Sequence, residues 1–109
     1  MQHVLSKFKI RPHKKEKTLS FLRDFNESRS REAKDSLLEA KITLEAWFVE
    51  SNESGDYLYI YKQLESAEHL KHCVATSTSP LYRDIRAWAA ECLETRDDWD
   101  ALAVVQSGA

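Results

Sequence analysis

The sequence has few glycines and no long apolar run, and both absences exclude classes of protein. Only Gly55 and Gly108 are present, so a glycine-rich loop that cradles phosphate groups is not expected. No apolar run approaches the ~20 residues that a membrane span needs, and the first residues lack the apolar core of a signal peptide. We therefore expect a cytoplasmic protein with no membrane partner.

Cysteine is also scarce, which limits disulfide and metal chemistry. Cys73 and Cys92 are too few for a disulfide scaffold, and buried reduced thiols are expected. His69 and His72 lie within one helical turn of Cys73, but no second cluster supplies the other ligands of a tetrahedral metal site. The sequence therefore predicts neither a metal nor a cofactor.

The remaining composition is typical of a globular protein. With 109 residues, 42% hydrophobic and 31% charged, the chain is long enough to form a core of its own. We expect one domain that spans residues 1–109.

The segment from Ile42 to Tyr61 has the pattern of two antiparallel strands. Runs rich in β-branched and aromatic residues, 42–50 and 57–61, flank a loop of Ser, Asn, Gly and Asp. Alternation along the first run places Leu44, Ala46 and Phe48 on one face and Glu45 and Trp47 on the other. This hairpin is expected at the centre of a sheet.

Alternation and helical spacing define the other elements. Alternation predicts a first strand at His3–Ile10, and Pro12 ends it. The Ser79-Pro80 pair predicts the start of a helix. The expected helices are 16–39, 65–76 and 80–94, followed by a loop at 95–98 and a last strand at 99–105.

This order predicts an α+β protein with the ferredoxin-like arrangement β-α-β-β-α-α-β. Right-handed crossovers place strands 3–10 and 57–61 in the middle of a four-stranded antiparallel sheet. All helices are then expected on one face of the sheet.

Several short motifs resemble a family of small proteins known only as a domain of unknown function. The similar residues are Arg29-Ser30-Arg31-Glu32-Ala33, Ser36-Leu37, Ile42, Glu45, Phe48 and Tyr57-Leu58-Tyr59-Ile60-Tyr61. That family looks like the dimeric α+β barrel group of the ferredoxin-like fold, so the resemblance implies this fold and a homodimer, and no activity. Two positions depart from its pattern: Lys41 replaces a glycine, and Ile85 replaces a histidine.

The predicted sheet has one apolar face and one aromatic face. Helices are expected to cover Phe8, Leu44, Phe48, Leu58 and Ile60. The opposite face would carry Leu5, Lys7, Lys9, Glu45, Trp47, Tyr57, Tyr59 and Tyr61. An exposed aromatic patch of this kind marks an interface or a groove. We therefore predict a homodimer through this face, with a pocket for a small polar or aromatic ligand between the two sheets. The candidate ligand-binding residues are Lys7, Lys9, Glu45, Trp47, Tyr59 and Tyr61.

Three alternatives remain at this point. Glu45 could accept a proton, which leaves catalysis open, or it could form a cross-strand ion pair with Lys7 in a purely structural dimer. The third alternative is an RNA-recognition module, because that fold has a similar strand order and the tyrosines could stack bases. A net charge of −2 and the absence of the module's glycine-containing aromatic signature make a nucleic-acid partner unexpected.

Overall fold

A computed structural model describes residues 1–108 and contains four strands and four helices. The strands are β1 (Gln2–Ile10), β2 (Ile42–Asn52), β3 (Gly55–Leu64) and β4 (Leu93–Asp100). The helices are α1 (Lys15–Asn26), α2 (Ser30–Glu39), α3 (Ala67–Thr76) and α4 (Pro80–Cys92).

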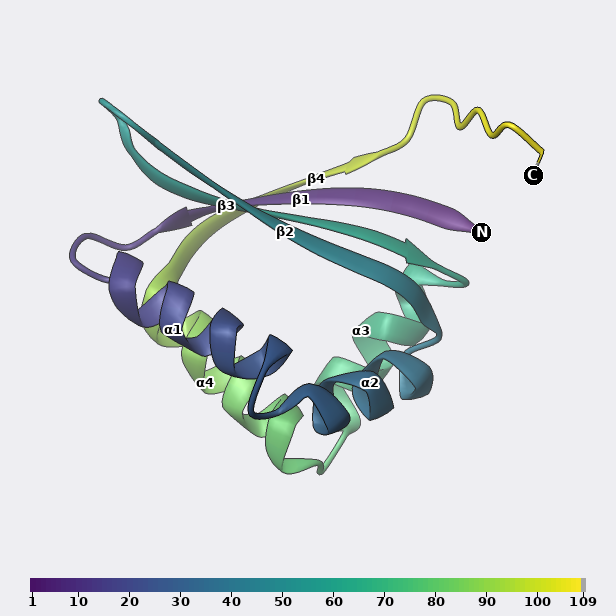
Figure 1. The fold of residues 1–109 in the computed structure, drawn as a ribbon, viewed down its shortest axis with the longest axis horizontal. Coiled ribbons are helices and arrows are strands. Elements are labelled where there is room, and N and C mark those ends of the chain that lie inside the picture. Colours follow the sequence, from purple (N-terminus) through teal and green to yellow (C-terminus); the bar gives the residue numbers. More distant parts are fainter. Residues whose placement is uncertain (109) are drawn as a thin grey trace.

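The strands form one antiparallel sheet in the order β2-β3-β1-β4. β1 and β3 lie in the middle, as predicted. β2 is an edge strand, so the expectation that the whole β2–β3 hairpin lies at the centre of the sheet was wrong. All four helices cover one face of the sheet, and no helix formed by residues 1–108 lies on the other face (Figure 1). The α+β ferredoxin-like fold predicted from the sequence is therefore confirmed.

The helix predicted from residue 16 to residue 39 is two helices, and that prediction was wrong. α1 ends at Asn26, and α2 begins at Ser30 after a turn in which the Arg29 amide donates to the carbonyl of Asp24 at 2.7 Å. Asn26 and Ser28 have weak helix propensity, because their side chains compete for backbone hydrogen bonds. The break lets α2 turn away from the axis of α1 (Figure 1).

The two helices after the hairpin begin at serine caps. The Ser66 hydroxyl accepts a hydrogen bond from the His69 amide, and Ser79 does the same for Tyr82, each at 3.2 Å. Pro80 occupies the first helical position of α4, where its missing N–H is not needed. The predicted helix start at Ser79-Pro80 is confirmed.

A β-bulge near the start of β2 reverses the face assignment predicted for that strand. Ile42 pairs with Leu64, but Leu44 pairs with Gln63, so β2 uses two residues where β3 uses one. One extra residue moves every later side chain to the other face. Glu45, and with it Trp47 and Val49, is therefore on the helix-covered face, whereas Leu44 and Phe48 are on the open face.

The last strand lies earlier in the chain than predicted. β4 spans Leu93–Asp100 and contains the segment 95–98 that was expected to be a loop, while residues 101–108 form no helix or strand. β4 pairs only with β1 and is an edge strand, where charged residues are common because one side faces solvent. The polar sequence of β4 therefore led to the prediction of a loop.

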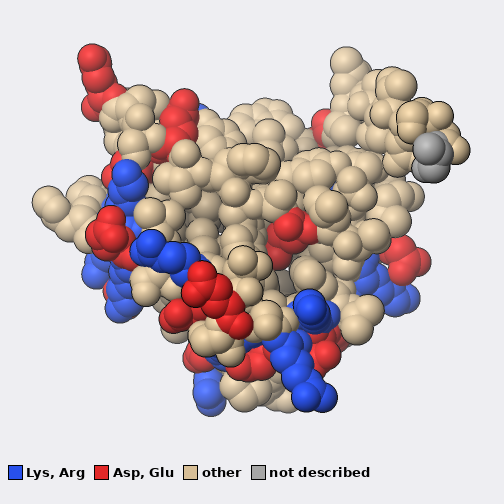
Figure 2. Space-filling model, in the orientation of Figure 1, with Lys and Arg blue, Asp and Glu red and all other residues tan. Residues whose placement is uncertain are grey.

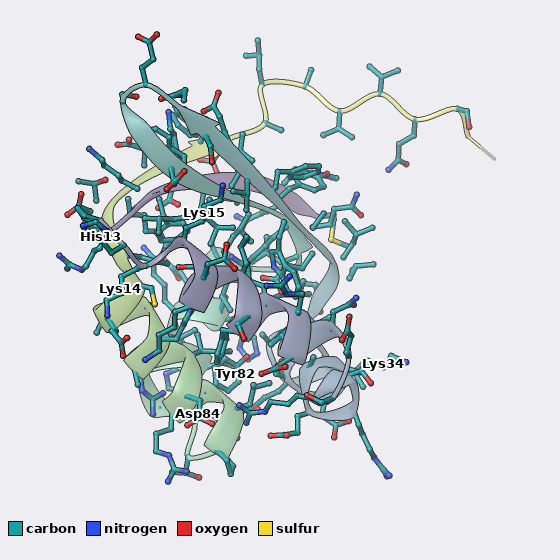
Figure 3. The ribbon with its side chains drawn as sticks, turned by 60° about the vertical axis from the view of Figure 1, so that its left-hand side comes forward. His13, Lys14, Lys15, Lys34, Tyr82 and Asp84 are labelled. Atoms are coloured by element: carbon teal, nitrogen blue, oxygen red, sulfur yellow. The ribbon has the colours of Figure 1, made fainter. Side chains whose placement is uncertain are left out.

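The core lies between the sheet and the helices. Leu58, Leu64, Leu81 and Cys92 are almost completely buried. Tyr82 points into the helical layer, whereas Lys34 points away from it (Figure 3). A turn at residues 12–13 leads into α1.

Charged side chains gather over the helical layer and at the tip of the β2–β3 hairpin, while the sheet region carries fewer (Figure 2). Among residues 1–108, no helix combines the length and the apolar character needed to cross a membrane.

Candidate functional site

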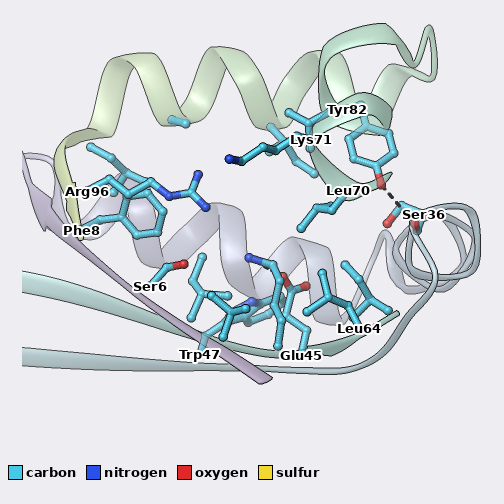
Figure 4. A pocket seen from close by; sticks show the side chains of 18 of the residues that line it. Ser6, Phe8, Ser36, Glu45, Trp47, Leu64, Leu70, Lys71, Tyr82 and Arg96 are labelled. Carbon is cyan, nitrogen blue, oxygen red and sulfur yellow. Dashed lines mark hydrogen bonds and ion pairs between the residues drawn. The ribbon is translucent and has the colours of Figure 1, made fainter. Parts of the chain in front are cut away.

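A cavity of about 700 Å³ separates the helix-covered face of the sheet from the helices. Its volume lies within the range of small-molecule sites. Most of its lining is apolar and comes from every strand and helix, including Val4, Phe8, Phe21, Phe25, Leu37, Ile60, Leu70, Val74 and Ile85. Figure 4 shows the sheet as its floor, with side chains from α3 and α4 on the opposite side.

An ion pair lies on the floor of this cavity. Glu45 of β2 and Lys62 of β3 are register partners, and the carboxylate Oε1 is 3.7 Å from Nζ. Their side chains are only 12% and 14% exposed. Burial raises the pKa of Glu45, although Lys62 and the Trp47 indole partly offset this effect. Burial likewise lowers the pKa of Lys62. A protonated carboxylic acid can therefore persist here at a higher pH than in water.

A second charged pair belongs to the edge strand. Arg96 donates from Nε to both carboxylate oxygens of Asp98 at 3.0 Å, and Ser6 donates to Asp98 at 2.5 Å. Burial alone would raise the pKa of Asp98, but these hydrogen bonds lower it below its usual value. The Arg96 guanidinium also lies 5.3 Å from the centre of the Phe8 ring. Asp98 is thus held as a carboxylate beside the cavity.

The helical side of the cavity carries further polar groups. The Tyr82 hydroxyl donates to the Ser36 carbonyl at 3.1 Å, and burial raises the pKa of Tyr82 to about 12, so this group stays protonated. Trp88 stacks on Phe21 with 4.8 Å between ring centres, and its buried indole N–H has no acceptor among residues 1–108. Lys71 of α3 also lines the cavity and is exposed.

The structure divides the six predicted ligand-binding residues between the two faces of the sheet. Glu45 and Trp47 line the cavity. Lys7 pairs across the strands with Tyr59, Lys9 with Tyr57 and Leu5 with Tyr61, all on the open face. The predicted Lys7–Glu45 ion pair is therefore wrong, because the bulge in β2 turns Glu45 toward Lys62. The six residues do not form one site.

Several polar side chains of the open face contact one another. Lys7 Nζ lies 4.4 Å from the centre of the Tyr57 ring and 5.5 Å from that of Tyr59. The Tyr59 hydroxyl donates to Glu50 at 2.8 Å, and the Tyr61 hydroxyl is 2.7 Å from His3 Nδ1. Ligand binding by Lys7, Lys9, Tyr59 and Tyr61 stays a prediction, and base stacking on this face stays an alternative that the sequence makes unexpected.

Sequence reasoning missed several polar residues of the cavity, namely Ser6, Lys62, Lys71, Arg96 and Asp98. For Lys62 a signal existed: it continues the inward alternation of Leu58 and Ile60, and a lysine in such a row needs a partner. Arg96 and Asp98 fell in a segment without a strand pattern, so no comparable signal marked them.

Residues 1–107 match a family described as "Family of unknown function (DUF6176)". The chain belongs to this family. The match confirms the resemblance to a domain of unknown function. No curated protein matches the DUF6176 chain.

Solved structures with the same fold include three that cover nearly the whole DUF6176 chain. One is a dimeric protein of unknown function and ferredoxin-like fold from Bacteroides fragilis, with 19% identity, a TM-score of 0.58 and coverage of 92% of this chain and 93% of that one. A structure named antibiotic biosynthesis monooxygenase has 19% identity, a TM-score of 0.60 and coverage of 96% and 100%. An uncharacterized NIPSNAP domain protein from Burkholderia xenovorans has 11% identity, a TM-score of 0.61 and coverage of 95% of each chain. At these identities the likeness shows the fold.

Proposed function

We propose that this protein binds a small organic molecule in the cavity between its sheet and its helices. The observation that supports this most strongly is the buried Glu45–Lys62 pair on the cavity floor. Burying two ions costs stability, and an apolar pair of similar volume is often equally stable or better. Ionisable groups that are retained in an apolar cavity are therefore good candidates for a functional role.

The lining suggests the kind of molecule that fits. Phe21, Phe25 and Trp47 surround a largely apolar space, and Phe25 meets Trp47 edge to face with 5.0 Å between ring centres. Aromatic walls of this kind favour a flat apolar body, with polar groups directed toward the Glu45–Lys62 pair. A ligand in this position would lie beside a carboxyl group that can give or take a proton, so proton transfer is the reaction step that the cavity would support.

We further propose that the protein forms a homodimer in which the open faces of the two sheets pack against each other. Phe48 is 58% exposed there, and Leu44 and Trp99 are 43% and 48% exposed. An apolar patch on a sheet without a covering layer is typical of an interface between protein copies. The B. fragilis neighbour is described as dimeric. In this arrangement each copy keeps its own cavity, on the side of the sheet away from the seam.

The cavity proposal is tested by an uncharged fluorescent probe and a blocking substitution. 1-Pyrenebutanol should bind the wild-type protein, with a change in pyrene fluorescence that saturates. Leu70→Trp places an indole in the cavity, so we expect it to weaken probe binding at least tenfold. Leu38→Trp is the matched control, because Leu38 is 76% exposed on α2. Equal binding by both variants, or no binding by the wild type, would contradict the proposal.

A further inference from the structure

Two exposed cationic side chains, Lys71 and Arg96, line the cavity, and we call the space between them its mouth. Lys71 extends from α3 and Arg96 from β4, and their charged ends point toward one another (Figure 4). Like charges that converge in this way repel unless an anion lies between them. Arg96 is held in this direction by the bifurcated hydrogen bond from its Nε to the Asp98 carboxylate, whereas Lys71 forms no ion pair with any residue from 1 to 108.

The charges around the cavity leave a positive excess. Four cationic and three acidic residues line it: Lys62, Lys71, Arg86, Arg96, Glu45, Asp98 and Asp100. Two of the cations are neutralised by carboxylates, as the Lys62–Glu45 and Arg96–Asp98 pairs show. In this count of charges, Lys71 and Arg86 remain against one acid, Asp100. One further negative charge would balance the site.

We propose that the ligand of this cavity is a monoanionic amphiphile, with one carboxylate bound between Lys71 and Arg96 and an apolar body among the aromatic side chains. This inference rests on the proposed function, because it names the chemical class of the molecule that the cavity takes. A single carboxylate matches the excess of one positive charge. Arg96 offers it a planar donor group, and Lys71 offers a mobile ammonium.

The apolar body would point from the mouth toward Trp47. The mouth residues and Trp47 lie on different sides of the cavity in Figure 4, with Leu70 and Leu64 along the intervening wall. The Glu45–Lys62 pair then lies beside the body of the ligand and not at its carboxylate. The two polar regions would thus hold different parts of one molecule.

Three probes with the same pyrene body separate charge from apolar binding: 1-pyrenebutyrate, 1-pyrenebutanol and 1-pyrenebutylamine. We expect wild-type protein to bind the butyrate about tenfold more tightly than the butanol, because that ratio corresponds to the free energy of one charge-assisted hydrogen bond. The amine should bind least tightly. Because the mouth is open to solvent, the preference should shrink as salt is added.

Substitution of Lys71 tests whether the carboxylate of the ligand binds at the mouth. Lys71→Met should bring the butyrate-to-butanol ratio close to one without weakening the butanol, and Lys71→Glu should shift the preference toward the amine. Lys34→Met is the matched control, since Lys34 is an exposed lysine of α2 that points away from the cavity (Figure 3). Lys71 is itself exposed, so these variants are expected to fold, and near-ultraviolet circular dichroism checks that they do.

The outcomes distinguish this inference from the proposed function. Binding of butanol and butyrate with equal affinity, or a preference that survives Lys71→Glu, would overturn the inference and leave the cavity as a binding site. Failure of all three probes to bind would overturn both.

Discussion

Glu45 and Lys62 face each other across β2 and β3, with 3.7 Å between Oε1 and Nζ and little exposure of either side chain. They meet because the bulge after Ile42 turns Glu45 toward the helices. This pair distinguishes the cavity from an ordinary apolar core.

Breaking the pair from one side should destabilise the protein. Lys62→Met leaves the Glu45 carboxylate buried without its partner, and we expect a loss of about 3 kcal/mol in the free energy of unfolding, at the lower end for buried pairs because some exposure remains. The double variant Glu45→Leu with Lys62→Met should be at least as stable as the wild type. Urea unfolding measures both effects. The control Arg23→Met breaks only an exposed contact to Glu16 and should cost less than about 0.5 kcal/mol. A double variant as unstable as the single one would contradict the prediction.

Stability should depend on pH through Glu45. Since burial raises the pKa of Glu45 above 4.5, the folded state holds this proton more tightly than the unfolded chain does. Protonation of Glu45 therefore contributes its full stabilisation of the folded state below pH 4.5. This stabilisation is lost as the pH rises through the pKa of Glu45 in the folded protein. Glu45→Gln removes this loss, so the stability of the wild type relative to Glu45→Gln should fall from acidic to mildly alkaline pH. Unfolding curves of both proteins at several pH values test this, and parallel pH profiles would refute it.

The open face of the sheet should hold the dimer together. Phe48→Glu places a charge on this face at a large apolar side chain that is 58% exposed, and we expect the mass in solution to fall from twice the 12.6 kDa chain to a single chain. Light scattering over a hundredfold concentration range measures this. Leu38→Glu adds the same charge to an exposed leucine on the helical side and should remain dimeric. If Phe48→Glu also stays dimeric, the seam lies elsewhere.

The segment after β4 should contribute to the dimer and little to the fold of one copy. A backbone hydrogen bond joins the Ala101 amide to the His3 carbonyl, and beyond it Leu102 and Val105 are almost fully exposed. Figure 1 shows it leaving the sheet. A chain that ends at Asp100 should therefore keep its circular dichroism spectrum and its affinity for 1-pyrenebutanol, while its dimer dissociates at a higher concentration. Loss of the folded spectrum would show instead that the segment stabilises each copy.

Much of the fold followed from local patterns. The serine cap with Pro80 fixed the start of α4, and alternation in β1 and β3 predicted their faces correctly: Phe8 pairs with Leu58, and Lys7 with Tyr59. These signals are local, so one sequence is enough to detect them.

The candidate site was harder to predict, because a single residue changed its composition. The bulge after Ile42 exchanged the faces of Glu45 and Phe48, and nothing in the sequence near Ile42 distinguishes a bulged strand from a regular one. Asp98 was not predicted as a site residue for a different reason. It lies in an edge strand, which can be polar, so the sequence of this strand resembled that of a loop. The site depends on pairing between distant strands, which propensity does not report.

The position of a bound probe shows whether the cavity is the binding site. A crystal structure of the wild-type protein with 1-pyrenebutanol should show the pyrene between the sheet and the helices, in contact with Trp47 and beside the Glu45–Lys62 pair. Density for the probe on the open face, against Tyr59 and Tyr61, would contradict the cavity as the binding site and would support a pocket between two sheets.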